Sequence, residues 1–137
     1  MLCVLIVPPK SLSIDLSPPV VKAGQTLTIT CTSSTSNPAS RLSWWKDGDQ
    51  VDQDDVTDGG TVPADYGGWS TVSRLTITPG VEDDGEIYAC RATNMLLDEA
   101  VSDAVTLNVL CTQPPLRLSN SLHLFVFLSV TRKPSYR

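Results

Sequence analysis

Apolar and polar side chains alternate with a period of two along several short stretches of this chain. Residues 25–31, QTLTITC, alternate strictly, which is typical of a half-buried β-strand. The same alternation predicts strands at 42–46 (LSWWK), 71–78 (TVSRLTIT), 87–93 (IYACRAT) and in the run of Val105, Leu107 and Val109. Clusters of Gly, Asp, Ser and Pro separate these stretches, and no apolar repeat of useful helical length occurs. The pattern therefore predicts an all-β sandwich or barrel.

Residues 47–68 form a polar, acidic and glycine-rich stretch in which this alternation is weak. We expect one short edge strand there, around Thr61 and Val62, with Trp69 and Ser70 leading into the strand that follows. The pattern predicts the backbone least well in this stretch.

The overall composition is that of one folded domain with tails. A chain of 137 residues suffices for one domain with a core but not for two, since domains usually run to about 100–150 residues. Hydrophobic residues make up 41% and charged residues 18%, so the chain can bury an apolar core. A net charge of -5 argues against clustered Lys and Arg for phosphate contacts, and we expect no nucleic-acid partner.

Three segments are expected along the chain. Residues 1–9 form a linker or the end of a preceding domain, 10–110 form the domain, and 111–137 form a linker and an unassigned tail or an artefactual extension. The stretch VLIVPP at 4–9 resembles 107–115, where LNVL precedes two prolines, which indicates tandem domains. The apolar runs at 2–7 and 122–130 are shorter than a signal-peptide core or a membrane span, respectively, and a span needs about 20 residues. We therefore expect a fragment of a longer chain.

The sequence lacks the ligand spacing of a metal site. Its four cysteines include no C-x-x-C pair, and its one histidine, His123, lies in the tail. The acidic run from Asp47 to Asp58 suggests calcium, but an EF-hand loop starting at Asp54 would place Val56 where an oxygen ligand is required. We expect no metal and no other cofactor.

Catalytic groups are also missing from the expected places. A Ser or Cys nucleophile needs a base within hydrogen-bond reach, and His123 sits among apolar residues of the tail. The paired carboxylates at 54–55 and 83–84 lie in predicted turns without the apolar surroundings that raise a catalytic pKa. We therefore expect no enzyme activity and no small-molecule substrate.

Two cysteines, a tryptophan and a tyrosine on the predicted strands form one constellation. Cys31 and Cys90 both point inward and stand 59 positions apart. Trp44 follows the first cysteine by 13 positions, and Tyr88 precedes the second by two. This order matches an immunoglobulin-like β-sandwich of two antiparallel sheets, in which the cysteines bridge the sheets and the indole packs on their sulfurs. The match also implies a tyrosine corner, in which the Tyr88 hydroxyl hydrogen-bonds to backbone upstream.

The remaining cysteines have no partner in such a sandwich. Cys3 and Cys111 fall near opposite poles, farther apart than the roughly 7 Å between Cα atoms that a disulfide allows. We expect them to be free, artefactual or intermolecular. A bridged Cys31–Cys90 pair would place the chain in an oxidising compartment.

Residues 18–110 resemble a C2/I-type immunoglobulin domain of a cell-adhesion receptor. The run SNPASRLSWWKDG at 36–48 is similar to the group that includes nephrin, sticks-and-stones and hibris proteins. The resemblance implies a single-pass membrane receptor with tandem immunoglobulin domains. One departure concerns the corner, because Glu86 stands where a small residue is usual and Gly85 lies one place earlier.

The resemblance also implies the partners and the location. The partners would be other cell-surface immunoglobulin-superfamily proteins, bound homophilically or heterophilically. The domain would lie on the extracellular side of the plasma membrane and reach the membrane only through a span outside this chain. The expected function is cell-cell adhesion or recognition.

Trp45 and Arg91 are the candidate protein-binding residues. If Trp44 faces the core, Trp45 faces outward on the sheet that also carries 87–93, beside an outward Arg91. Exposed Trp and Arg are enriched at interface hot spots. Alternatively, Trp45 is covered by its own neighbouring edge strand or stacks on Arg91.

Other functions share this fold. The domain could act as a spacer between contacting domains rather than as a contact. A secreted or immune-type receptor module is one alternative to an adhesion receptor. An intracellular structural domain of muscle type is another, and it would need no disulfide.

Overall fold

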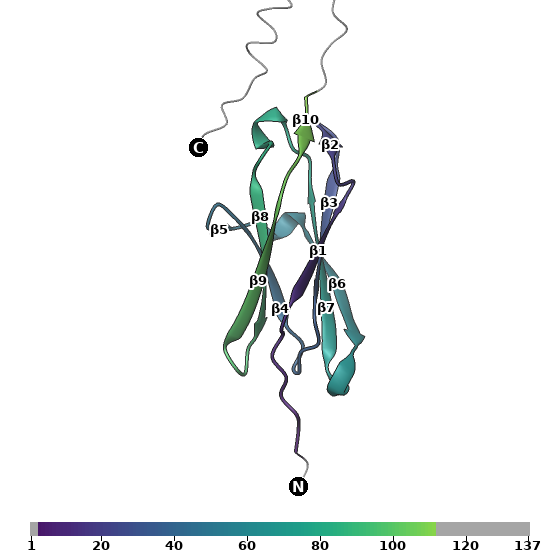
Figure 1. Cartoon of the computed structure of the whole chain (residues 1–137), viewed down its shortest axis with the longest axis vertical. Helices are drawn as coiled ribbons and strands as arrows, with labels where there is room; N and C mark the ends of the chain where they lie inside the picture. Colours follow the sequence, from purple (N-terminus) through teal and green to yellow (C-terminus); the bar gives the residue numbers. More distant parts are fainter. Residues whose placement is uncertain (1–2, 112–137) are drawn as a thin grey trace, which may run out of the picture.

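A computed structural model describes residues 3–111 of the chain (Figure 1). The strands are β1 (Leu12–Ser17), β2 (Val21–Lys22), β3 (Leu27–Ser33), β4 (Arg41–Lys46), β5 (Asp49–Gln50), β6 (Val56–Pro63), β7 (Trp69–Ile77), β8 (Ile87–Asn94), β9 (Glu99–Thr106) and β10 (Val109–Leu110). Short 3-10 turns occupy Gln53–Asp55, Asp65–Gly67 and Val81–Asp83. The predicted strands at 25–31, 42–46, 71–78 and 87–93 correspond to β3, β4, β7 and β8.

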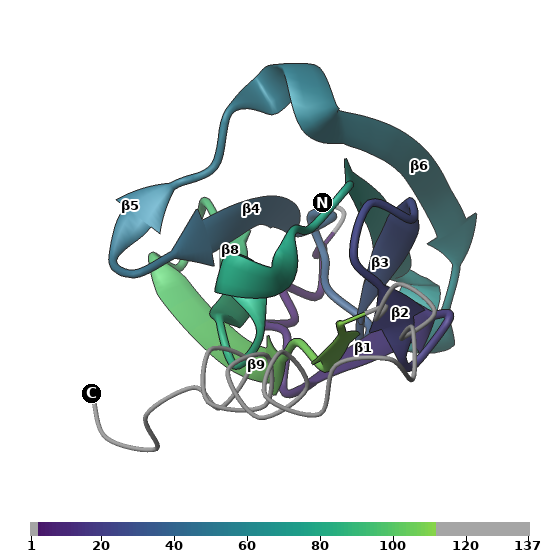
Figure 2. The ribbon, with the colours of Figure 1, turned by 90° about the horizontal axis from the view of Figure 1, so that it is seen from above.

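Two antiparallel sheets pack face to face (Figure 2). One sheet has the strand order β1-β3-β7-β6, and the other has the order β5-β4-β8-β9. A separate two-stranded pair joins β2 to β10 in parallel. The prediction of an immunoglobulin-like sandwich of two antiparallel sheets is thereby confirmed.

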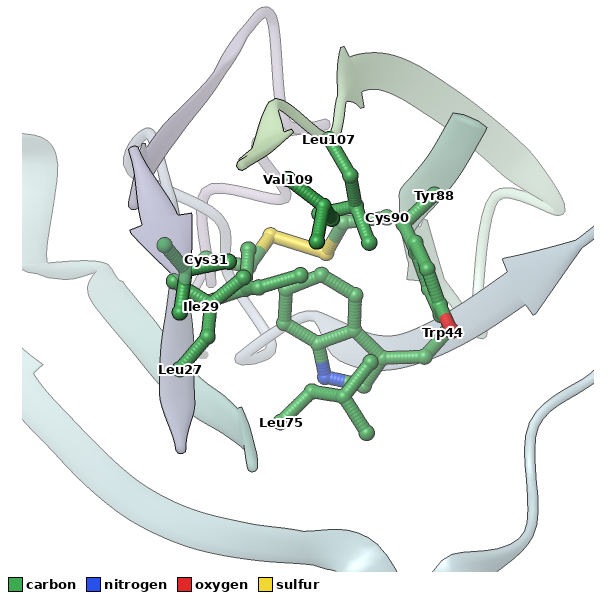
Figure 3. Close-up of a cluster of buried hydrophobic side chains, with 10 residues drawn as sticks. Leu27, Ile29, Cys31, Trp44, Leu75, Tyr88, Cys90, Leu107 and Val109 are labelled. Carbon is green, nitrogen blue, oxygen red and sulfur yellow. A yellow bond between two sulfur atoms is a disulfide. The ribbon is translucent and has the colours of Figure 1, made fainter. Parts of the chain in front are cut away.

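The core lies between the inner faces of the two sheets and contains the disulfide. Cys31 on β3 and Cys90 on β8 are bridged with an S–S distance of 2.04 Å and a Cα–Cα distance of 6.5 Å. Figure 3 shows the disulfide beside the indole of Trp44, which is fully buried. Trp44 lies opposite Cys90 in the register of β4 and β8. The other core side chains are Val21, Leu27, Ile29, Leu75, Tyr88, Leu107 and Val109.

The indole of Trp44 is held by a hydrogen bond as well as by packing. Its Nε1 donates to the Oγ of Ser73 on β7 at 2.9 Å, and Ser73 is itself buried. A buried indole N–H without a partner would destabilise the fold, and the hydrogen bond to Ser73 removes this cost. The contact also ties the two sheets together beside the disulfide.

The first strand of the domain was not predicted, although its sequence carries a signal. β1, with the sequence LSIDLS, alternates half-buried and exposed side chains along its whole length. β1 pairs with β3 in one sheet. β2 pairs with β10, which comes directly after β9 of the other sheet along the chain. The segment from Leu12 to Lys22 therefore closes one side of the sandwich by contacting both sheets.

The predicted edge strand around Thr61 and Val62 is present, but the prediction that it is short and the single strand within 47–68 was wrong. The structure has the two-residue β5 and the longer β6, which pairs with β7 around a bulge between Asp58 and Thr61. β6 is an edge strand with mostly exposed side chains, so backbone hydrogen bonds rather than apolar alternation define it. A Cβ on Gly59 would lie 2.7 Å from Cγ1 of Val72, which explains the glycine in this bulge.

The predicted last run is divided between two strands. Val105 lies near the end of β9, which begins much earlier, at Glu99, and Val109 belongs to β10. Leu107 lies between the two strands, where its backbone exchanges hydrogen bonds with Gly85 and Glu86. Leu107 and Val109 are nevertheless buried, as the alternation predicts.

Candidate protein-binding face

Trp45 lies on β4 between the edge strand β5 and the central strand β8. Its register partners are Gln50 on β5 and Ala89 on β8. The side chain is half-buried, and its Nε1 donates to the Oγ of Ser43 at 2.9 Å. Ser43 precedes Trp45 by two positions and shares its face, so the indole lies along its own strand on the outside of the sheet.

Arg91 lies on the same outer face, opposite Ser43 in the register of β4 and β8. It is exposed and makes no hydrogen bond or ion pair with any residue between 3 and 111. The cation–π contact found in this part of the chain joins Lys46 to Tyr88. Stacking of Arg91 on Trp45 is therefore not observed in this part of the chain.

The outer face of the β4-β8-β9 layer consists mostly of small, uncharged side chains. The register places its members on neighbouring strands. They are Arg41, Ser43 and Trp45 on β4, Ile87, Ala89, Arg91 and Thr93 on β8, and Ala100, Ser102, Ala104 and Thr106 on β9. We call these residues the outer face. Its only charges are two arginines, although the whole chain carries a net charge of -5.

Tyr88 is buried on the inner side of β8, beside the end of β4. Lys46 is its register partner, and the Lys46 Nζ lies 5.5 Å from the centre of the tyrosine ring and 3.6 Å from Oδ1 of Asp83. Burial raises the pKa of the Tyr88 hydroxyl above its ordinary value of 10.0, although Lys46 acts in the opposite direction. The hydrogen bond from Tyr88 to upstream backbone stays a prediction.

The pKa of Lys46 is raised as well. Burial alone would lower this pKa, but Tyr88, Asp83 and Glu86 together favour the charged ammonium and outweigh the burial. Lys46 and Asp83 thus connect the end of β4 to the 3-10 turn that precedes β8. The cluster belongs to the interior side of the sheet and not to the outer face.

Alkaline pH should destabilise the domain because both pKa values are raised on folding. Below about pH 10 the contribution of Tyr88 and Lys46 is fully present, and it is lost as the pH rises, because the unfolded chain then releases these protons first. Urea unfolding midpoints measured from about pH 8 to about pH 11 should therefore fall at the alkaline end. Tyr88→Phe should flatten this decline, because it removes one of the two groups whose pKa is raised on folding. Equal pH profiles for wild type and Tyr88→Phe would contradict the assignment.

Asn94 is a buried residue that the sequence analysis missed. It ends β8 and is fully buried, and its Nδ2 donates to Val7 O at 3.0 Å, to Ser36 Oγ at 3.1 Å and to Asn37 O at 3.2 Å. Its Oδ1 accepts from the backbone N–H groups of the next turn. An Asn at the end of a strand signals such a turn, but nothing in the sequence signals its contacts with distant segments.

The remaining predicted features lie at the margins of the described chain. Cys3 and Cys111 are free and exposed, and the two ends of the described chain lie at opposite ends of the sandwich (Figure 1). His123 and the predicted tail at 112–137 lie outside the described residues. Within residues 3–111, no three His, Cys, Asp or Glu side chains gather as a metal site would require. The described part of the chain also has no helix long and apolar enough to span a membrane.

Comparison with known proteins finds a match to an immunoglobulin domain family and similarity to Kin of IRRE-like proteins and nephrin. Residues 8–94 match the family described as "Immunoglobulin domain". Kin of IRRE-like protein 3 of Homo sapiens is 32% identical over 114 residues, which are 82% of this chain and 14% of that protein. Nephrin of Homo sapiens is 31% identical over 106 residues, which are 75% of this chain and 8% of nephrin. The chain thus spans a small part of these relatives.

Solved structures show the same fold. The crystal structure of Rst D1-D2 matches with a TM-score of 0.66 and 23% identity, covering 76% of this chain and 50% of that one. The full ectodomain (Ig1-Ig3) of mouse nectin-like molecule 4 also matches with a TM-score of 0.66 and 23% identity, covering 77% of this chain and 35% of that one. At this identity the two matches carry information about the fold alone.

Proposed function

Because this chain belongs to the immunoglobulin domain family, we propose that it is a protein-binding domain of a cell-surface adhesion receptor. Residues 10–110 form the domain within a longer tandem array, 1–9 form a linker or the end of a preceding domain, and 111–137 form a linker and an unassigned tail or an artefactual extension. Its partners are other cell-surface immunoglobulin-superfamily proteins. Similarity to Kin of IRRE-like proteins and nephrin supports this function.

The binding surface is the outer face, and Trp45 on β4 is its anchor. Trp45 is the large aromatic side chain of this face, and the surrounding residues are mostly Ala, Ser and Thr. Short side chains leave a smooth sheet against which a partner can pack, and a half-buried Trp loses little conformational freedom on binding. This arrangement is the single observation that carries the proposal.

The charge of the outer face favours a different protein over a second copy. Arg41 and Arg91 are exposed and have no acidic neighbour among the outer-face residues. Two copies meeting through this face would bring arginines toward arginines, which like-charge repulsion disfavours. A partner that presents Asp or Glu would gain charge complementarity and bidentate hydrogen bonds to the guanidinium groups. The proposed contact is therefore heterophilic, with an acidic partner surface.

The disulfide supports the extracellular location. Disulfides persist in oxidising compartments and are rare in the cytosol, so the Cys31–Cys90 bridge disfavours the muscle-type structural alternative. A secreted or immune-type receptor module would carry the same bridge. Detection of a membrane-anchored product of the gene on the surface of intact cells separates the proposed receptor from that alternative.

Substituting Trp45→Ala should weaken binding by at least about 10-fold, as expected for truncation of an aromatic anchor at an interface. The chain would be titrated against the ectodomains of Kin of IRRE-like protein 3 and nephrin and against itself, with binding followed by biolayer interferometry. Arg91→Ala should also weaken binding, with a stronger effect at low salt because charge steering is screened by ions.

The matched control is Arg74→Ala, which removes an exposed arginine from β7 in the opposite sheet. This variant should bind like wild type, and the melting temperatures of all three variants should show that they fold. Wild-type affinity of a folded Trp45→Ala variant would remove the outer face as the binding surface.

A further inference from the structure

The end of the sandwich where the chain enters carries a group of exposed apolar side chains. Val4 is 70% exposed and Leu5 57%, and Ile6 is also exposed. In the turn between β8 and β9, Met95 is 59% and Leu96 67% exposed, and Leu97 is exposed too. Figure 1 shows the entering segment and the β8–β9 turn at the same end of the molecule. We call residues 4–6 and 95–97 the entry pole.

A hydrogen-bond network holds the two parts of the entry pole together. The backbone of Val7 exchanges two hydrogen bonds of 2.9 Å with Asn37, and Nδ2 of Asn37 donates to Leu5 O at 2.6 Å. Asn94 donates to Val7 O and accepts from the N–H groups of Leu96 and Leu97 at 3.0 and 3.3 Å. The entering segment and the turn are thus fixed by the same buried side chain.

The composition of the turn is unusual for an exposed β-hairpin. Such turns are normally built from Gly, Asn, Asp and Ser, which supply turn geometry and hydrogen-bond to water. Here three large apolar residues follow Asn94 in a row before Asp98. Exposing them to water costs free energy without improving the turn, and contiguous apolar surface of this kind marks an interaction site.

We propose that the entry pole docks an immunoglobulin domain that precedes this one in a longer polypeptide. Val7 and the N–H groups of Leu96 and Leu97 all bind the Asn94 side chain, so the entering segment is held at the same end of the sandwich as the β8–β9 turn. The stretch at 4–9 also resembles the stretch at 107–115 at the other end of the domain, as expected where one domain follows another. The inference rests on the tandem arrangement in the proposed function, but it is independent of the outer face.

The size of the entry pole favours a tethered domain over a second copy. A stable complex between separate proteins usually buries about 800 Å² on each partner, more than six side chains around one turn are expected to provide. A domain joined by a short linker is present at an effective concentration in the millimolar range, so a small apolar contact suffices to hold it. The docked domain would therefore be held at a fixed angle to this one and would not move as on a free hinge.

Oxidation of Met95 by hydrogen peroxide tests the docking, because an exposed thioether reacts faster than a covered one. The rate would be followed by peptide mass spectrometry in the 137-residue chain and in the longer product of the same gene. We expect oxidation to be at least about fivefold slower in the longer product. Equal rates, or a longer product without a preceding immunoglobulin domain, would overturn the proposal.

A pair of variants of the longer product sharpens the test. Leu96→Asp should release the docked domain and restore the fast oxidation of Met95, whereas Val20→Asp, a control on an exposed valine outside the entry pole, should leave it slow. Sedimentation of the 137-residue chain tests whether a second copy of the chain occupies the entry pole instead. Concentration-dependent dimers in which Met95 becomes protected would assign the entry pole to a second copy and overturn the proposal. Binding through Trp45 is measured separately, so failure of either proposal is recognisable.

Discussion

Replacing Cys31 and Cys90 together by alanine should lower the free energy of unfolding by about 4 kcal/mol. The disulfide joins residues 59 positions apart, and the loop-closure model assigns stabilisation of that size to the entropy that a closed loop of this length removes from the unfolded chain. A domain of this size has a total stability of about 5–15 kcal/mol, so the variant should be marginally folded at best. Urea unfolding of the oxidised wild type and the double variant, followed by circular dichroism, measures the difference.

The two free cysteines supply the control for this experiment. Cys3 and Cys111 are exposed and unpaired, so replacing both by serine should leave the unfolding midpoint unchanged. Adding reductant to this control variant should then reproduce the destabilisation of the double alanine variant. A reduced protein as stable as the oxidised one would show that the bridge contributes little.

Trp44→Ala should destabilise the domain by about 3–5 kcal/mol, the usual cost of removing a buried aromatic side chain. The substitution removes the indole that lies between the disulfide and Leu75, and it leaves the buried Oγ of Ser73 without its donor (Figure 3). Trp44→Phe keeps most of the packing but loses the hydrogen bond, so its cost should be smaller. Urea unfolding of the oxidised proteins checks both values.

Trp45→Ala is the matched control, because it removes the same side chain one position later on the same strand. Trp45 is only half-buried, and its hydrogen-bond partner Ser43 also lies on the outer face. We expect a much smaller loss of stability, in the range of about 1 kcal/mol that is common for single substitutions. Equal losses for Trp44→Ala and Trp45→Ala would contradict the assignment of inner and outer faces.

The sequence alone predicts the centre of the fold well. Strict alternation in β3 and β8 places Cys31 and Cys90 on inner faces, and the spacing to Trp44 selects one arrangement of the sheets. These elements are predictable because each strand buries one face, so apolar residues occur at every second position of its sequence. The same alternation is present in β1, where Leu12, Ile14 and Leu16 are half-buried and the residues between them are exposed.

Other features of the structure have no such alternation in the sequence. β6 is held by backbone hydrogen bonds to β7 and exposes nearly all of its side chains, so its residues show neither alternation nor apolar clustering. Asn94 is equally hard to predict, because its partners Val7 and Asn37 are distant in sequence. A buried polar residue acquires its role only when distant segments are brought together.

The candidate sites divide in the same way. The outward orientation of Trp45 follows from parity along one strand, so the sequence suffices to propose it. The positive, small-residue character of the outer face depends on the register of β4, β8 and β9, and the entry pole depends on the path of the entering segment. The outer face and the entry pole are formed by residues that are neighbours in space but distant in sequence, so no single stretch of sequence predicts them.

The polar, bulged strand β6 has a consequence for solubility. An open sheet edge offers unpaired N–H and C=O groups to which a strand from another molecule can add, which is a common route to aggregation. The bulge at Gly59 and Gly60, together with the exposed carboxylate of Asp58, interrupts this row of groups, and β5 at the edge of the other sheet is only two residues long. Addition of a strand from another copy of the domain is therefore disfavoured at β5 and β6.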